Sequence, residues 1–347
     1  MATCETDAQL CGTALLRAAR DSPAAPRGNT HSGLATRWLR QYRFFNVHST
    51  AGARMETQEL TWTWRARRIV IGLDRLGKGP VILLLPALSS ISTRHEMRPL
   101  QERLASRFRT ISVDWPGFGD RARPKVDWDS ATYSEFFAFL LTSVVPKLHA
   151  VVAAGHGGTY ALAYAAAHPQ SIQQLVLLAP TWRGPLPTIM AGQRPFFNRL
   201  RQLVDLPILG PLLYRLNVNR LVIRHMAAGH VYSNPAWLRD SRLREKLVVT
   251  RASGARFASV RFIAGYLDPL ASRDAFLRVA MAVTNPVLVV YGVQTPRKSR
   301  EEIEALVAVR GIRSVCLPYG KLAIHEEFPD AVGDVIEPFL SEKSPGL

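Results

Sequence analysis

The chain has 347 residues, 47% of them hydrophobic and 20% charged, so it can bury a large core and is neither disordered nor fibrous. Its three cysteines have no spacing that suits zinc or a disulfide framework, and its longest apolar run, residues 80–88, is about half of what a membrane-spanning helix of ~20 residues needs. The net charge of +17 is concentrated, because residues 183–284 hold sixteen Lys and Arg against five Asp and Glu.

Residues 1–54 show no sustained helical or strand period and are rich in Ala, Thr, Ser, Arg, Gly and Pro. We expect them to lie outside the fold, either as a non-globular leader or as an extension from a misassigned start, with Met55 as the true beginning. They contain no apolar segment of the secretory kind. A cytoplasmic location is therefore expected, or a plastid location if these residues are a transit peptide.

The folded part begins with two segments, 60–64 and 69–73, in which apolar residues alternate with polar or small ones. This period predicts two antiparallel edge strands joined near residues 65–68, and the continuous apolar run 81–85 predicts a strand covered on both faces. The rest of the chain repeats an apolar strand followed by an amphipathic helix, which indicates an α/β fold with a mainly parallel sheet. The further predicted strands are 110–113, 150–154, 175–178, 286–291 and 314–317, and the predicted helices are 94–106, 131–148, 159–168, 297–309 and 325–340.

Residues 183–284 interrupt this repeat. They contain seven prolines, several short helical stretches and most of the excess positive charge. We expect a helical lid over the carboxyl ends of the strands, where ligands of open parallel sheets bind. The predicted division of the chain is a leader (1–54), a core in two parts (55–182 and 285–342), the lid (183–284) and a tail (343–347).

Three segments of the chain resemble the α/β-hydrolase fold family. LLLPALSS (83–90) is similar to the strand and loop that donate the first oxyanion amide, and DWPGFGDRARP (114–124) is similar to the family's D-x-P-G-x-G-x-S segment. AAGHGGTYALAYAAAHP (153–169) resembles the strand, nucleophile elbow and following helix. The resemblance covers nearly all of residues 57–342 and implies an eight-stranded sheet with a helical lid after strand 6.

The same resemblance implies where the catalytic triad should stand. A nucleophile elbow needs small residues two before and two after the nucleophile; Gly155 and Thr159 fit, which places Gly157 at the nucleophile position. The family's acid position falls on Thr295. The sequence HEE-x-P (325–329) aligns with the family's segment before the last helix, and this alignment places Leu322 where the catalytic histidine belongs. All three positions are therefore predicted to be vacated, as in a subgroup of bacterial and plastid members that lack the serine.

A serine hydroxyl is a weak nucleophile unless a histidine takes its proton, and a carboxylate must orient that histidine. Loss of the nucleophile or the base costs ~10⁶-fold in turnover. Backbone amides of Leu88 and Gly158 would remain as an oxyanion-hole-like pair. We predict a pseudo-hydrolase that binds a small apolar or amphiphilic ligand or a protein partner; the alternative is an active ester or amide hydrolase with displaced catalytic residues.

Two histidines are weak candidates for catalytic residues that lie outside the vacated triad positions. His156 lies beside the vacant position and His325 lies at the start of the last helix, and both fit packing or capping roles more simply. Ligand-pocket candidates are polar residues of the oxyanion loop and of the segments that border or form the lid: Ser89, Ser90, Trp182, His230 and Tyr232.

Cofactors are not expected, because the sequence has no P-loop, dinucleotide fingerprint or metal-ligand spacing. Residues 195–226 of the lid interleave apolar residues with arginines. This pattern suits a lid packed on the core with solvated arginines, a mouth that attracts an amphiphilic ligand, or peripheral contact with an anionic membrane, which is the second alternative function. Nucleic acid is an unlikely partner, since no recognised module accompanies the charge.

Overall fold

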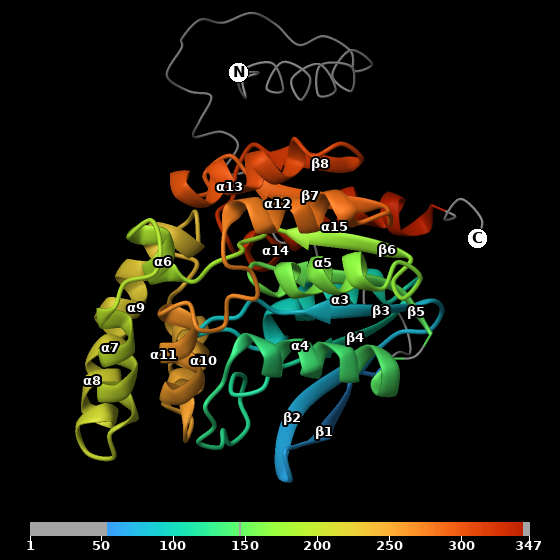
Figure 1. Ribbon diagram of the computed structural model, residues 1–347. Helices are drawn as coiled ribbons and strands as arrows, with labels where there is room; N and C mark the ends of the chain where they lie inside the picture. The colour runs from blue at the N-terminus through green and yellow to red at the C-terminus, as the bar shows by residue number, and fades with distance from the viewer. Residues whose placement is uncertain (1–53, 146, 343–347) are drawn as a thin grey trace, which may run out of the picture. The chain divides into compact units, whose positions relative to one another are not determined.

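The computed structural model describes residues 54–145 and 147–342 (Figure 1). Its strands form one eight-stranded sheet in the order β1-β2-β4-β3-β5-β6-β7-β8. β2 is antiparallel to both β1 and β4, and all other pairs are parallel. The predicted α/β-hydrolase sheet is confirmed. The strands are β1 Glu56–Trp64, β2 Arg67–Leu76, β3 Val81–Leu85, β4 Arg109–Val113, β5 Leu148–Ala154, β6 Gln174–Leu178, β7 Val287–Gly292 and β8 Ile312–Leu317.

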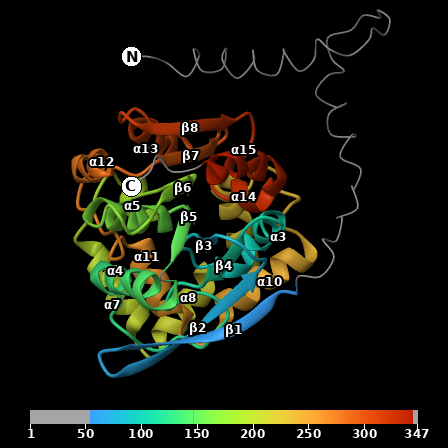
Figure 2. The same cartoon turned by 90° about the vertical axis from the view of Figure 1, so that its right-hand side faces the viewer.

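Helices cover both faces of the sheet, as the continuous apolar character of the central strands requires. Along β3, Ile82 and Leu84 face α3, α14 and α15, whereas Leu83 and Leu85 face α4, α5 and α12. Figure 2 shows these two helix layers on opposite sides of the sheet. The core helices are α3 Arg98–Leu104, α4 Ser130–Phe139, α5 Gly157–Ala167, α12 Arg273–Ala282, α13 Arg297–Val307, α14 Ile324–Glu327 and α15 Pro329–Ser341.

Prolines divide or shorten three helices that the sequence predicted as continuous. The segment 94–106 becomes a 3₁₀ turn, η1 Arg94–Met97, followed by α3, which has Pro99 in its first turn. The helix predicted to reach residue 148 ends in a π turn, η2 Leu140–Val144, because the residue before Pro146 avoids helical backbone angles. The last helix is divided into α14 and α15 at Pro329.

Several helices lie between β6 and β7. α12 packs against α5 and α13 as part of the sheet layers, so the insertion ends before residue 284 and not at it. We call residues 183–267 the helical insertion. It contains α6 Pro185–Ile189, α7 Phe196–Asp205, α8 Leu209–Asn217, α9 Arg220–Met226, the π turn η3 Ala227–Val231, α10 Asp240–Arg251 and α11 Ala255–Ile263. Figure 1 shows α7 and α8 at its outer edge.

No helix within the described ranges is long and apolar enough to span a bilayer. The predicted leader, residues 1–54, lies outside these ranges except for Arg54, and the predicted tail, residues 343–347, lies wholly outside them.

Candidate functional site

The sharp turn between β5 and α5 is centred on Gly155. This residue has a φ of +50°, and its N–H donates to the carbonyl oxygen of Leu178 at 2.9 Å. A Cβ added to Gly155 would lie 3.2 Å from the Cβ of Ala87, so the loop after β3 rests directly on the turn. The side chain of a residue at position 155 would therefore emerge where the carboxyl ends of β3 and β5 meet.

Gly157, predicted as the vacated nucleophile position, and Gly158, predicted as an oxyanion donor, belong to the helix instead. Gly157 is the first residue of α5, and Gly158 donates its N–H to the carbonyl oxygen of Gly155 at 3.2 Å. The turn thus lies two residues earlier than the sequence pattern placed it, because His156, Gly157 and Gly158 already start the helix. The amide predicted at Gly158 as an oxyanion donor is engaged in the first helical turn. Leu88, the other predicted donor, is buried in the loop after β3.

The predicted acid position, Thr295, follows β7 and is buried. Its N–H donates to the carbonyl oxygen of Gly292 at 3.0 Å, which closes a tight turn. Its Oγ1 has no hydrogen-bond partner within the described part of the chain. A buried hydroxyl without a partner costs free energy, but a threonine supplies no carboxylate to orient a histidine.

The predicted histidine position lies in the loop between β8 and α14. Leu322 is half-buried and packs against the core cluster beneath α15. Its neighbour Lys321 directly follows Gly320, which has a φ of +93°. Lys321 Nζ donates to the carbonyl oxygen of Ala228 in the insertion at 2.6 Å. Neither residue of this loop provides an imidazole.

His156 is fully buried beside a carboxylate that the sequence analysis did not single out. Its Nε2 donates to the carbonyl oxygen of Leu267 at 3.0 Å and lies 3.4 Å from Asp268 Oδ1. Burial lowers the pKa of His156 to about 4, against the hydrogen bond to Leu267. Burial also raises the pKa of Asp268 to about 7, against the hydrogen bond from the N–H of Gly184 and the charge of Arg183. The imidazole is therefore neutral near neutral pH, and the pair is a close polar contact rather than an ion pair. Asp268 is the only acidic residue between Glu245 and Asp274, which is a weak signal in the sequence.

A buried cluster of charged groups joins the insertion to the core, and we call it the Lys246 cluster (Glu96, Tyr232, Lys246, His325 and Glu326). Lys246 Nζ lies 2.9 Å from Glu326 Oε1 and 3.8 Å from Glu96 Oε2. Tyr232 donates its hydroxyl to Glu326 Oε2 at 2.8 Å, and His325 Nε2 lies 3.5 Å from Glu96 Oε1. Burial opposes the ionisation of Glu96, but His325 and Lys246 lower its pKa, so the carboxylate stays charged. His325 and Tyr232, predicted as catalytic and pocket candidates, are therefore held in this cluster.

Of the other pocket candidates, Ser89 and Trp182 have structural partners. Ser89 Oγ accepts the N–H of Ile91 at 3.4 Å, as a loop hydrogen-bonder does. Trp182 donates its indole N–H to Glu302 Oε2 at 3.0 Å and so points towards α13. Ser90 is half-buried and His230 is exposed on η3. Tyr232 lines a hollow.

That hollow lies within the insertion and has a volume of about 280 Å³. Its walls are largely apolar, and its lining includes two arginines, a histidine and Tyr232. Its size is at the lower end of the range for small-molecule sites. The lining residues include Leu221, Arg224, His225, Tyr232, Leu238 and Arg239.

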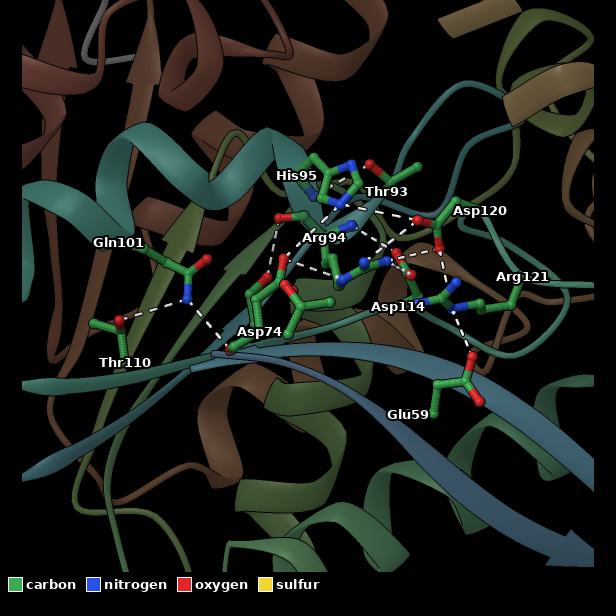
Figure 3. A network of polar contacts seen from close by, with 12 residues as sticks. Glu59, Asp74, Thr93, Arg94, His95, Gln101, Thr110, Asp114, Asp120 and Arg121 are labelled. Atoms are coloured by element: carbon green, nitrogen blue, oxygen red, sulfur yellow. Dashed lines mark hydrogen bonds and ion pairs between the residues drawn. The ribbon is translucent and has the colours of Figure 1, made fainter. Parts of the chain in front are cut away.

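A second buried charge network holds the loops at the carboxyl ends of β3 and β4 (Figure 3). Arg94 Nη1 lies 2.6 Å from Asp114 and 2.8 Å from Asp120, and Arg94 Nε lies 3.1 Å from Asp74. Burial raises the pKa of Asp114 to about 6, against the charge and hydrogen bonds of Arg94. Because Asp114 opens the DWPGFG segment, this network fixes the positions of these loops. No group of three or more His, Cys, Asp or Glu in residues 54–145 and 147–342 is arranged to hold a metal ion.

The comparisons with known proteins agree with the fold. A family model described as the alpha/beta hydrolase family matches residues 82–335. A 2-(acetamidomethylene)succinate hydrolase of Mesorhizobium japonicum is 30% identical over 113 residues, which are 32% of this chain and only 39% of that protein. A hydrolase from Pseudomonas aeruginosa superposes with a TM-score of 0.62 at 19% identity, over 82% of this chain and 98% of its own. A thermophilic esterase from Thermogutta terrifontis gives 0.63 at 20% identity, over the same shares. At these identities the two structures establish the fold alone.

Proposed function

The chain belongs to the α/β-hydrolase family, and from that premise we propose that it is a pseudo-hydrolase, a member that has lost acyl-transfer chemistry and binds a small amphiphilic ligand. The observation that carries the proposal is Gly155. It is the residue of the β5–α5 turn with a positive φ, the conformation that exposes the nucleophile in a nucleophile elbow, and it has no side chain. The amide that follows the turn, the usual oxyanion donor, then belongs to His156.

The other two triad positions support the same reading. Thr295 follows β7 where the family carries its acid, and it offers a hydroxyl only. The histidine position falls on Lys321 when it is counted from Gly320, or on Leu322 when it is counted from the HEE sequence. In either register, a serine placed at residue 155 or 157 would have no base to take its proton.

The hollow in the insertion is the ligand site that we propose. Its apolar walls suit a short alkyl or aromatic body, and Arg224 and Arg239 in its lining suit one carboxylate or similar anionic group. Medium-chain carboxylates such as decanoate are therefore suitable probes. Binding should raise the melting temperature with ligand concentration, and Arg239→Ala should weaken that shift while leaving the ligand-free melting temperature nearly unchanged.

Fluorophosphonate labelling and nitrophenyl-ester turnover test the loss of catalysis. We expect neither labelling nor turnover above the buffer rate for the wild-type protein. Gly155→Ser should also remain inactive, since base and acid are missing, and Gly157→Ser serves as the matched control inside the helix. Stoichiometric labelling of the wild-type chain, or efficient hydrolysis by Gly155→Ser, would contradict the proposal.

A second candidate function is an active hydrolase with displaced groups. The observation that favours it is the buried His156–Asp268 contact at 3.4 Å, an imidazole beside a carboxylate next to the elbow. This candidate predicts ester turnover that falls at least ~10²-fold in Asp268→Asn, a variant that keeps the shape of the side chain. Turnover that is unchanged in Asp268→Asn would remove it.

A further inference from the structure

The outer edge of the insertion exposes an unusual amount of apolar surface. Of the thirteen large hydrophobic residues that are exposed within the described ranges, ten lie between residues 189 and 226. The largest exposed fractions are 89% for Ile208 and 75% for Leu221, followed by Leu216 at 60% and Leu212 at 57%. Single exposed hydrophobic residues are ordinary, but a group of this size on neighbouring helices marks an interaction surface.

The helix α8 shows how this surface is organised. Leu209, Leu212 and Leu216 are spaced three and four residues apart, so they share one face, and all three are exposed. The other face is packed: Gly210 is buried against α7, where a Cβ would lie 2.1 Å from the carbonyl oxygen of Val204, and the hydroxyls of Tyr214 and Ser259 lie 3.3 Å apart. The helix is therefore held in place with its apolar face outward.

Positive charge surrounds these apolar side chains. Residues 183–231 contain seven arginines and one acidic residue, Asp205, which is already paired with Arg261 at 2.8 Å. Five of these arginines are exposed and have no ion-pair partner among the described residues: Arg194, Arg199, Arg215, Arg220 and Arg224. The segment 183–231 therefore has no unpaired carboxylate that could neutralise these arginines.

We propose that α7, α8 and α9 form a docking surface for an anionic lipid bilayer, with the helices lying in the plane of the interface. Exposed leucines and isoleucines gain free energy by entering the acyl boundary, and arginines gain it from acidic headgroups. Ile208, in the turn between α7 and α8, is the most exposed residue of the group and enters furthest. An acidic protein partner would match the charge, but nine exposed apolar side chains spread between residues 196 and 226 suit the acyl boundary of a bilayer better, so lipid is the occupant that we assign. This inference does not depend on whether the cleft is catalytic.

Co-sedimentation of the full chain with vesicles tests the inference. Binding is expected to vesicles of phosphatidylcholine that contain a minor fraction of phosphatidylglycerol, to be much weaker with phosphatidylcholine alone, and to fall as salt is raised. Changing Arg199, Arg215, Arg220 and Arg224 together to Glu should lower the partition coefficient at least ~100-fold, since one surface arginine is worth about fivefold.

The matched control changes the same number of exposed arginines on the core. The control positions are Arg98, Arg107, Arg278 and Arg310, each changed to Glu. Both variants carry the same net charge, so they differ only in where the charges lie. If binding depends on α7, α8 and α9, the control should bind vesicles within about threefold of wild type. Equal loss in both variants would show general charge attraction and would overturn the inference.

The apolar part of the surface has its own pair of variants. Ile208→Asn, Leu212→Asn and Leu216→Asn together should reduce vesicle binding at least tenfold, whereas Val248→Asn, Met281→Asn and Val293→Asn, which are exposed elsewhere, should not. All six positions are exposed, so the variants should fold, and circular dichroism checks this. Absence of wild-type binding at low salt would overturn the inference. So would a dimer, seen by analytical ultracentrifugation, that the Asn variants dissociate while vesicle binding stays unchanged.

Discussion

Replacement of Arg94 by methionine should destabilise the fold strongly. The guanidinium contacts three carboxylates, of which Asp74 and Asp114 are about 1% exposed. Methionine fills similar space but leaves these two carboxylates buried without a countercharge. Loss of one partner of a buried ion pair costs about 3–5 kcal/mol. We expect the free energy of unfolding to fall by that amount at neutral pH, which is a large share of a typical stability of about 5–15 kcal/mol.

The effect of Arg94→Met should also depend on pH, and the sign follows from Asp114. Its pKa is raised to about 6 in the folded protein, so the folded state binds the proton more tightly than the unfolded chain does. The contribution of Asp114 to stability is therefore largest at low pH and falls as the pH rises towards about 6. Without Arg94 the pKa of Asp114 rises further, so the fall extends to higher pH. The destabilisation should be greater at about pH 8 than at about pH 5.

Urea unfolding followed by tryptophan fluorescence measures both effects. Arg94→Lys should lie between wild type and Arg94→Met, because it keeps the charge but not the forked hydrogen bonds. Arg297→Met is the control: among the described residues this exposed arginine pairs only with Glu301 on the same helix, and its loss should cost less than about 0.5 kcal/mol. A loss below about 1 kcal/mol for Arg94→Met, or one independent of pH, would refute this account of the network.

Two further variants test the other buried charges. Lys246→Met leaves Glu96 and Glu326 buried without their cation, and we expect a loss of about 3 kcal/mol in urea unfolding at neutral pH; a loss similar to that of an exposed lysine would contradict the ion cluster. Asp268→Asn should stabilise the protein above about pH 7 and change little near pH 4, because the raised pKa of Asp268 makes its ionised form unfavourable in the folded state. A variant whose stability falls between those pH values as steeply as that of wild type would exclude this explanation.

Much of the fold follows from local sequence patterns. β3 consists of the five apolar residues between Pro80 and Pro86, and its bounds are those of the predicted strand 81–85. The prediction was less accurate at the ends of helices, where amphipathic spacing continues past the residue at which a proline stops the backbone. The helix predicted over 325–340 is one amphipathic pattern but two helices, because Pro329 starts a new one.

The candidate site could be predicted in part. The segment 153–158 contains only small residues and one histidine, so small-residue spacing fits an elbow centred on residue 155 or residue 157. Backbone geometry distinguishes them, because only Gly155 has a positive φ. The networks around Arg94 and Lys246 were not predicted. Their partners come from segments far apart in the chain, such as Glu96 and Glu326, and no local spacing relates such residues before the sheet is assembled.

Gly155 also bears on how the chain can evolve. A side chain held at a positive φ costs about 1–3 kcal/mol, and a hydroxymethyl group here would in addition press against Ala87. Under the proposed loss of catalysis, a serine introduced at this position alone would bring that cost without any gain in reaction rate. Gly155 would then be favoured over serine as long as the histidine and acid positions lack their catalytic groups.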